Sequence, residues 1–333
     1  MEELGMAVSD AHAGPGRDAE TWERLLGLER QVQELRRLLL AGAPTLGAQY
    51  GDADRADAEH PARLPTREAP RADWQVTCLG PFRLSCGARP IAPCSSRRGW
   101  AILQFLLAQP GHTARRDVPI EAFWPGAHPA RGAHRLQMAI HALRRSLRGC
   151  GPGGNDEAIV FHDGQYLLNP ALTLDLDVVR FQEACERGAQ LADAEQPEAA
   201  RRVLEAALAL YGGPFLASGS HDEWAEAPRA ALHERRLGAL GRLSEVYAAL
   251  GAWEQAARCC QEILAADPYR EDAIRQLLRC LAATGRLAEV ERTYRACRAR
   301  IWHDLQVEPA PETTRLYHQI VLAPRRQSVL TGT

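Results

Sequence analysis

Apolar residues repeat with a helical period near the start of the chain. They are spaced alternately by three and four positions between residues 17 and 42, at Leu25, Leu28, Val32, Leu35 and Leu39. This spacing predicts an amphipathic helix that either pairs as a short coiled coil or packs on its own chain. Residues 43–73 lose the period and fill with Ala, Asp, Arg and Pro, so we predict a flexible linker there and a disordered tail over 1–16.

The pattern changes at Trp74, where short apolar runs typical of strands, WQVTCLG and FRLSCG, replace the helical period. Three helical stretches follow, the first capped by Ser95 or Ser96, the second over 116–123 and the third over 128–148. An Asp-Gly turn between the runs AIVFH and QYLL then predicts a hairpin. This order of elements predicts a winged helix-turn-helix over residues 74–170.

From residue 171 the pattern is helical almost throughout. Gly251 and Gly285 stand 34 positions apart, as do several residues around them, and a 34-residue period of helix pairs is typical of tetratricopeptide repeats. We therefore predict an all-α helical-repeat domain over 171–323 and a tail over 324–333. The predicted fold class is mainly α, an α+β winged helix-turn-helix followed by a tetratricopeptide-like domain. The large aromatic residues of that domain are expected in its core or, alternatively, in a peptide groove: Trp224, Tyr247, Trp253 and Tyr269.

Charge is distributed unevenly along the chain, although the net charge is only −2. Residues 74–170 hold 11 Arg and 5 acidic residues, a net of +6, whereas the segments before and after carry −5 and −3. A basic segment between two acidic ones is typical of a module that binds a polyanion. All 40 basic residues are Arg, which excludes a phosphate loop that depends on Lys, and the helical repeats carry no catalytic constellation. We predict that the protein is not an enzyme.

The nine cysteines form no Cys-x-x-Cys pair, and no apolar run approaches the length of a membrane span. We expect reduced thiols, no bound metal, no cofactor and no membrane partner. The expected location is the cytoplasm, in association with the nucleoid.

The third predicted helix carries the main candidate site. An apolar stripe of Leu136, Ile140, Leu143 and Leu147 is suited to docking on the domain, and no acidic residue occurs between Arg131 and Arg148. Arg suits guanine edges and phosphates, and Gln suits adenine, so the polar face of this helix is predicted to enter the major groove of duplex DNA. The candidate contacts on it are Arg131, His134, Arg135, Gln137, His141, Arg144, Arg145 and Arg148.

Two further places are candidates for contact with DNA. Arg97 and Arg98 stand at the start of the first helix, where free backbone amides add to their charge, so they form either a phosphate clamp or a solvated cap. His162 and Gln165 flank the hairpin turn and are expected to contact the minor groove or a phosphate, although Asp163 beside them would repel one.

Several segments resemble one family of regulators. FWPGA at 123–127, LQMAIHALRRSL at 136–147 and GQYLL at 164–168 resemble the winged helix of response regulators, and most of all that of the SARP-type (Streptomyces antibiotic regulatory protein) transcriptional activators. YGGPFL, EWAEAPRAALHERR, DPYREDAIRQLLRCLAATGR and LQVEPAPETTRLYHQI follow in the order found in the bacterial transcriptional activation domain of that family. The resemblance covers about residues 74–322.

The resemblance implies an activator that binds repeated half-sites of promoter DNA, as a homodimer, and helps to recruit the RNA polymerase holoenzyme. One position departs from the family pattern: related helices commonly read Ser-Arg-Leu-Arg where this chain has His141-Ala142-Leu143-Arg144. A basic contact is therefore missing at Ala142, for which Arg135 and His141 are possible substitutes. The alternative hypothesis is a helical-repeat adaptor whose winged helix mediates protein interaction instead of DNA binding.

Overall fold

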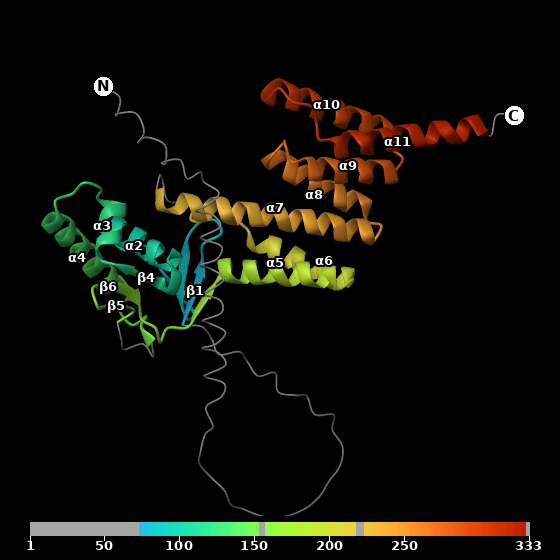
Figure 1. The fold of residues 1–333 in the computed structure, drawn as a ribbon. Coiled ribbons are helices and arrows are strands. Elements are labelled where there is room, and N and C mark those ends of the chain that lie inside the picture. Colours follow the sequence, from blue (N-terminus) through green and yellow to red (C-terminus); the bar gives the residue numbers. More distant parts are fainter. Residues whose placement is uncertain (1–72, 153–156, 218–222, 331–333) are drawn as a thin grey trace, which may run out of the picture. The chain divides into compact units, whose positions relative to one another are not determined.

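The computed structural model describes residues 73–152, 157–217 and 223–330 (Figure 1). The predicted tail over 1–16 and helix over 17–42 lie outside the described residues, as does all but the end of the linker over 43–73. The described residues form two compact units, and neither is continuous in sequence. The first contains 73–76, 83–152, 157–175 and 223–231, and the second contains 77–82, 176–217 and 232–330.

A four-stranded sheet in the order β3-β2-β1-β7 comes first in the described part of the chain. It is formed by β1 (Trp74–Thr77), β2 (Arg83–Cys86), β3 (Arg89–Ile91) and β7 (Leu174–Leu176). β3 and β7 were not predicted, because each has only three residues and too few positions to show an alternation. Residues 171–176, predicted as the start of the helical domain, therefore include a strand of this sheet.

Three helices follow: α2 (Arg97–Ala108), α3 (Asp117–Phe123) and α4 (Pro129–Ser146). Ser96 caps α2 as predicted, since its hydroxyl oxygen accepts a hydrogen bond from the Gly99 amide at 3.0 Å. The core beneath them is apolar and fully buried at Leu103, Leu106 and Leu136.

The predicted hairpin is present, with β5 (Ile159–His162) and β6 (Gln165–Leu168) paired antiparallel. Asp163 and Gly164 at its turn both have positive φ, 47° and 75°, as a tight hairpin turn with Asp-Gly requires. A short strand that the sequence pattern did not reveal, β4 (Thr113–Arg115), follows the short helix η1 (Pro110–His112) and extends the sheet to the order β4-β6-β5.

The first unit also includes residues from well beyond the hairpin. In the short helix η3 (Glu223–Ala225), the Trp224 ring lies 5.2 Å from that of Phe105 and 6.3 Å from that of Phe123 between centroids. Trp224 was predicted to pack in the core of the repeats, and that prediction is wrong. The large apolar ring instead completes an aromatic cluster of α2 and α3, where edge-to-face contacts are favourable.

The second unit is built from helical hairpins. They are α5 (Asp177–Asp193) with α6 (Pro197–Leu210), α7 (Glu226–Ala249) with α8 (Trp253–Ala266) and α9 (Glu271–Ala283) with α10 (Leu287–Leu305), followed by α11 (Pro311–Leu330). The first six residues of α7, 226–231, belong to the first unit. Tyr247 and Trp253 pack against a buried core of α8, α9 and α10, as predicted. Tyr269 does not join it, because the residue is 39% exposed and its hydroxyl donates to Asp304 at 2.7 Å.

The 34-residue period has a direct structural cause. Gly251 and Gly285 both adopt φ 73°, and the next amide donates in each case to a carbonyl five residues earlier, Ala252 to Tyr247 and Arg286 to Leu281, at 2.8 Å. This left-handed end of a helix is a favoured place for glycine. The α5–α6 hairpin has the same turn, but its left-handed position is Glu195, with φ 55°.

The segment that follows β1 belongs to the second unit. Both carboxylate oxygens of buried Asp177, the first residue of α5, accept backbone amides, of Cys78 at 2.8 Å and of Leu79 at 2.9 Å. Burial raises the pKa of this carboxyl despite the hydrogen bonds that favour its charged form. The Gly212 and Leu216 amides donate to the carbonyls of Leu79 and Cys78. The YGGPFL motif and Asp177 therefore hold the backbone of these two residues from both sides.

Candidate nucleic-acid interface

α4 separates its apolar and basic residues onto opposite sides. Leu136, Ile140 and Leu143 are at most 3% exposed and face the core, as the predicted stripe requires. The residues spaced by three and four from Arg131 to Arg148 lie on the opposite side, and we call these the outer face of α4. They are Arg131, His134, Arg135, Met138, His141, Ala142, Arg145 and Arg148, with Gln137 at the edge; all are exposed except Ala142, which is half-buried.

Both ends of α4 are held by backbone and side-chain contacts. At the start, Pro129 occupies the first helical position and the His128 ring accepts the Ala130 amide at 3.4 Å. At the end, the indole of buried Trp74 donates to the Cys150 carbonyl at 2.7 Å, and the Arg89 guanidinium donates to the Arg148 carbonyl at 3.3 Å. The N-terminal sheet therefore anchors the segment just after α4, which includes Arg148, two residues beyond the last helical residue, Ser146.

A close approach of α2 fixes the middle of α4. A Cβ atom added at Gly99 would lie 2.7 Å from the Ala139 carbonyl oxygen, so no larger residue fits without moving one of the two helices. Because Ala139 is on the inner side of α4, this contact sets how far the outer face stands from the domain core.

Arg144 differs from the other candidate residues of α4. Its side chain is 32% exposed, and its Nε donates to the Ile159 carbonyl at 3.0 Å and lies 3.4 Å from a carboxylate oxygen of Glu157. The structure thus joins Arg144 to strand β5 and does not leave its guanidinium on the outer face. A residue so engaged positions the hairpin against the helix.

The remaining arginines of the outer face have no acidic neighbour in the described part of the chain. Arg131, Arg135, Arg145 and Arg148 form no ion pair with any described carboxylate, and their side chains reach into solvent. Four guanidinium groups on one face without neutralising acids repel one another, and an anion laid along that face would relieve the repulsion.

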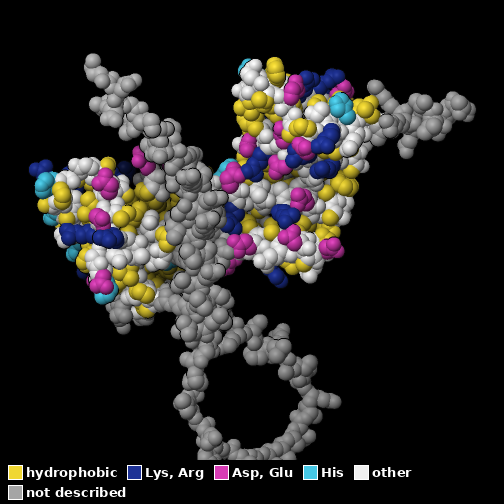
Figure 2. Space-filling view, viewed as in Figure 1, with side chains coloured by type: hydrophobic (Ala, Val, Ile, Leu, Met, Phe, Trp, Pro, Cys, Tyr) yellow, Lys and Arg dark blue, Asp and Glu magenta, His cyan; other side chains and the backbone are white. Residues whose placement is uncertain are grey.

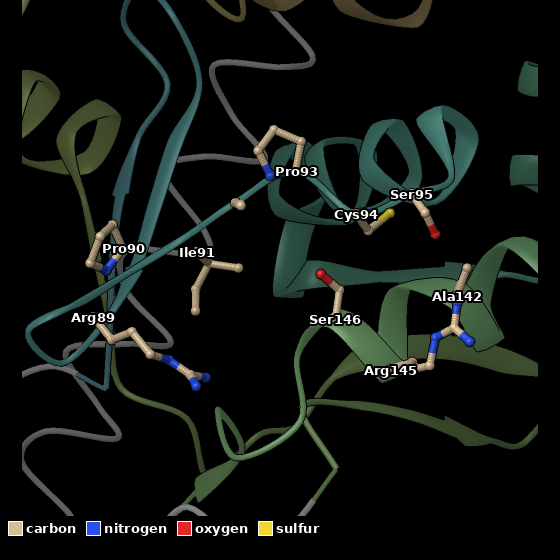
Figure 3. Close-up of a pocket in the computed structure, with 10 residues that line it drawn as sticks. Arg89, Pro90, Ile91, Pro93, Cys94, Ser95, Ala142, Arg145 and Ser146 are labelled. Atoms are coloured by element: carbon tan, nitrogen blue, oxygen red, sulfur yellow. The ribbon is translucent and has the colours of Figure 1, made fainter.

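Two shallow pockets lie along α4 where it meets the start of α2. Arg98, predicted as a phosphate clamp, lies 5.8 Å over the Phe123 ring and lines one pocket with Trp124, His134, Arg135 and Met138. Figure 3 shows the other, with Ala142, Arg145 and Ser146 of α4 facing the segment from Pro93 to Ser95. The structure therefore brings Arg98 together with the α4 candidates, while Arg97 is exposed and lines neither pocket.

The hairpin offers less than α4. His162 is 79% exposed, but its Nε2 lies 3.3 Å from the carboxylate of Asp163, which is equally exposed. Gln165 is half-buried and its side-chain oxygen accepts a hydrogen bond from the Thr113 hydroxyl of β4 at 3.1 Å. Of the two predicted hairpin contacts, only His162 projects freely from the tip.

Most of the second unit is similar to a domain of known proteins. Residues 176–321 match the family model of the bacterial transcriptional activator domain. The chain is 27% identical over 248 residues to the transcriptional regulatory protein MoaR1 of Mycobacterium tuberculosis, covering 74% of this chain and 79% of MoaR1. It is also 27% identical over 260 residues to the regulatory protein AfsR of Streptomyces coelicolor, covering 78% of this chain and 25% of AfsR.

Through its activator domain and its relatives, the chain is similar to the SARP-type transcriptional regulators. The resemblance seen in the sequence is confirmed, and so is the prediction that the protein is not an enzyme, because its relatives are regulators of transcription. The fold also matches Mycobacterium tuberculosis EmbR, solved in complex with a low-affinity phosphopeptide, with a TM-score of 0.65 at 24% identity. That match covers 75% of this chain and 65% of the EmbR chain and confirms the predicted fold class.

The sequence interpretation missed two exposed apolar residues near the candidate DNA contacts. Met138 lies on the outer face of α4 and is 57% exposed, and Phe161 on β5 is 49% exposed and lies against Tyr166. A helical wheel centred on Arg131 and Arg145 would have placed Met138 among the basic residues.

Among the described residues, no helix is long and apolar enough to cross a membrane. The same part of the chain contains no group of three or more His, Cys, Asp or Glu side chains placed to hold a metal ion.

Proposed function

We propose that this regulator is a sequence-specific DNA-binding activator whose helix α4 enters the major groove. The observation that carries the proposal is the outer face of α4, where Arg131, Arg135, Arg145 and Arg148 have no acidic partner among the described residues. Phosphates would neutralise some of these groups and fix the register of the helix, while others contact base edges. Arg98 and His162 would add phosphate contacts on either side.

The proposal extends to the assembly on the promoter. Two copies bind repeated half-sites, and the activator domain over 176–321 contributes to recruitment of the RNA polymerase holoenzyme. The support is the family, since relatives are named as transcriptional regulators and share this domain. Footprinting on a promoter that the full chain selects from genomic DNA would show two protected repeats, and sedimentation of the complex would show two chains; a single protected half-site would contradict the pairing.

Salt dependence tests the DNA-binding proposal most directly. Because a protein that neutralises phosphates releases counterions, the logarithm of affinity should fall linearly with the logarithm of salt concentration, with a slope of about −0.9 for each phosphate contacted. The full chain is the right sample, since Trp224 forms part of the unit that carries α4. Arg135→Ala should reduce the slope by about 1, while Arg258→Ala, an exposed change on α8, should leave it unchanged.

The competing hypothesis, an adaptor that binds protein through its winged helix, has the exposed carboxylate of Asp163 at the hairpin tip in its favour. Binding of selected duplexes that showed no dependence on salt, or no binding at all, would support the adaptor and reject the DNA proposal.

A further inference from the structure

The centre of the outer face of α4 is apolar. Met138 and Ala142 are one helical turn apart, and Met138 is 57% exposed although the neighbours that share its face are Arg and His. The basic residues stand to either side of this pair: Arg131, His134 and Arg135 before it, His141 beside it, and Arg145 and Arg148 after it. The part of the helix that would lie deepest in a groove therefore carries methyl groups.

The pockets on α4 give this pair defined surroundings. Met138 lines one with Arg98, His134 and Arg135, and Ala142 lines the other with Arg89 and Arg145. A ligand seated on these methyl groups would be flanked by guanidinium groups on both sides. That combination suits a ligand with an apolar group between anionic ones.

Duplex DNA offers one such group in its major groove, the C5 methyl of thymine, while its other exposed edges there are hydrogen-bond donors and acceptors. The thioether of Met is flexible and polarisable and adapts to small apolar partners. A separation of four residues spans about 6 Å along a helix axis, which is within two base steps of about 3.4 Å.

We infer that Met138 and Ala142 determine sequence specificity by contacting the C5 methyl groups of thymines within two base steps of each other in each half-site. The inference rests on the proposed DNA binding by α4 and deepens it. Ala142 then does not merely lack the basic contact common in the family; it replaces a polar contact with an apolar one and changes the base that is preferred.

Replacement of thymine by deoxyuridine removes only the methyl group and tests this inference. Duplexes are first selected by the full chain from a random library, and each dT of the selected half-site is then replaced by dU, one at a time. Burial of one methyl group corresponds to about a fourfold gain in affinity. We expect two positions where dU weakens binding about fourfold, and no loss at the other thymines.

Variants at Met138 identify which of the two thymine methyl groups this residue contacts. Met138→Ala should abolish the dU effect at one of the two positions and keep the salt slope, whereas Met138→Leu should retain the effect. Val118→Ala is the matched control, because Val118 is an apolar residue of α3 that is 44% exposed and lies outside the face.

The possible results distinguish the thymine contact from DNA binding itself. Tight binding of selected duplexes with no dU effect at any thymine, or an undiminished effect with Met138→Ala, would overturn the thymine contact while leaving DNA binding intact. Failure to select or bind any duplex would overturn the proposed function, and this inference with it.

Discussion

The arginines of α4 and those of the helical hairpins are the same residue type in opposite situations. On α5 to α10 many guanidinium groups are paired: Arg201 with Glu198 and Glu205, Arg242 with Asp193 and Glu245, and Arg286 with Glu254 and Glu289. Figure 2 shows basic and acidic side chains interleaved over these helices. On the outer face of α4 the arginines lack such partners among the described residues. The number of arginines is therefore uninformative about nucleic-acid binding; what distinguishes α4 is that several arginines without an acidic partner share one face.

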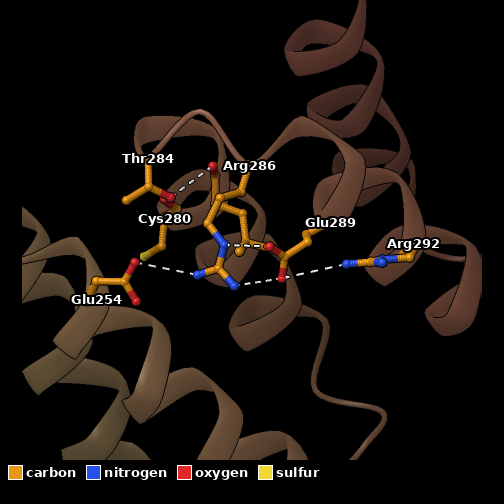
Figure 4. A network of polar contacts seen from close by, with 7 residues as sticks. Glu254, Cys280, Thr284, Arg286, Glu289 and Arg292 are labelled. Carbon is orange, nitrogen blue, oxygen red and sulfur yellow. Dashed lines mark hydrogen bonds and ion pairs between the residues drawn. The ribbon is translucent and has the colours of Figure 1, made fainter.

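The cluster around Arg286 shows how ion pairing neutralises the charge of an arginine. Arg286 donates to both carboxylate oxygens of Glu289 at 2.6 Å and lies 3.5 Å from Glu254, and Arg292 is 3.9 Å from Glu289 (Figure 4). The hydrogen bonds from Arg286 hold the pKa of Glu289 below its usual value. A guanidinium that already has a bidentate carboxylate partner gains little from a phosphate.

The largest expected effect comes from removing the unpaired charges together. Arg131→Ala, Arg135→Ala and Arg145→Ala in one chain should weaken specific DNA binding by at least about a hundredfold, since each such contact contributes about 1–3 kcal/mol. The salt slope measured by titration should decrease by up to about 3.

The control for that variant removes three paired arginines instead. Arg201→Ala, Arg242→Ala and Arg286→Ala together should lower the melting temperature slightly and leave the DNA affinity unchanged, because exposed ion pairs contribute little to stability. Equal loss of DNA binding in both triple variants would contradict the claim that the unpaired arginines of α4, and not the paired ones of the hairpins, contact DNA.

Alanine variants of two tightly packed glycines compare the α4 region with the helical hairpins in a second way. Gly99→Ala should cost about 1–3 kcal/mol in the free energy of unfolding, because the new methyl would meet the Ala139 carbonyl, and it should also weaken DNA binding by displacing α4. At Gly188 on α5 the new methyl would meet the Leu204 side chain, so Gly188→Ala should destabilise the protein without changing DNA affinity beyond the folded fraction. Chemical denaturation and titration of the two variants would show whether the effect on DNA is specific to α2 and α4.

Alanine variants of Arg144 and Arg135 should distinguish a residue that positions the hairpin from one that contacts DNA. Arg144→Ala removes the hydrogen bond to the Ile159 carbonyl, at a cost of about 1 kcal/mol in stability, and should leave the salt slope unchanged. Arg135→Ala should have the reverse pattern, with no loss of stability and a smaller slope. A reduced slope for Arg144→Ala would show that its guanidinium leaves β5 when DNA binds.

The smallest effect is a gain. Glu195 has φ 55° at the position where the two other hairpins have Gly, so Glu195→Gly should raise the free energy of unfolding by up to about 1 kcal/mol. Thermal unfolding measures it, and DNA affinity should not change. Lower stability would show that the Glu195 side chain makes a contact that outweighs its backbone strain.

Periodic and turn signals in the sequence predicted much of this fold. The stripe from Leu136 to Leu147, the Ser96 cap and the Asp163-Gly164 hairpin follow from local chemistry, and each is present. The three-residue strand β7 pairs with β1, which lies about a hundred residues earlier, and no local pattern encodes that pairing. β3 pairs with its neighbour β2 across a two-residue turn, but three residues are too few to show an alternation.

The candidate site was predictable to a similar degree. The direction of each α4 residue follows from its position on the helix, but the partners of Arg144 and Gln165 do not, because Glu157, Ile159 and Thr113 come from other elements. Trp224 was misplaced for the same reason: its apolar character predicts burial without saying in which core.

The hydrogen bonds that hold Cys78 and Leu79 against Asp177 and the YGGPFL motif have a consequence for synthesis on the ribosome. The amides of Cys78 and Leu79 emerge about a hundred residues before their acceptor, and Trp224 emerges later still. A nascent chain that has reached residue 170 holds every candidate DNA contact but lacks β7, the Asp177 carboxylate and the last ring of the aromatic cluster. We expect the unit that carries α4 to complete its fold only after Trp224 has been translated, within the activator domain, so chains that end near residue 170 should lack a stable candidate interface.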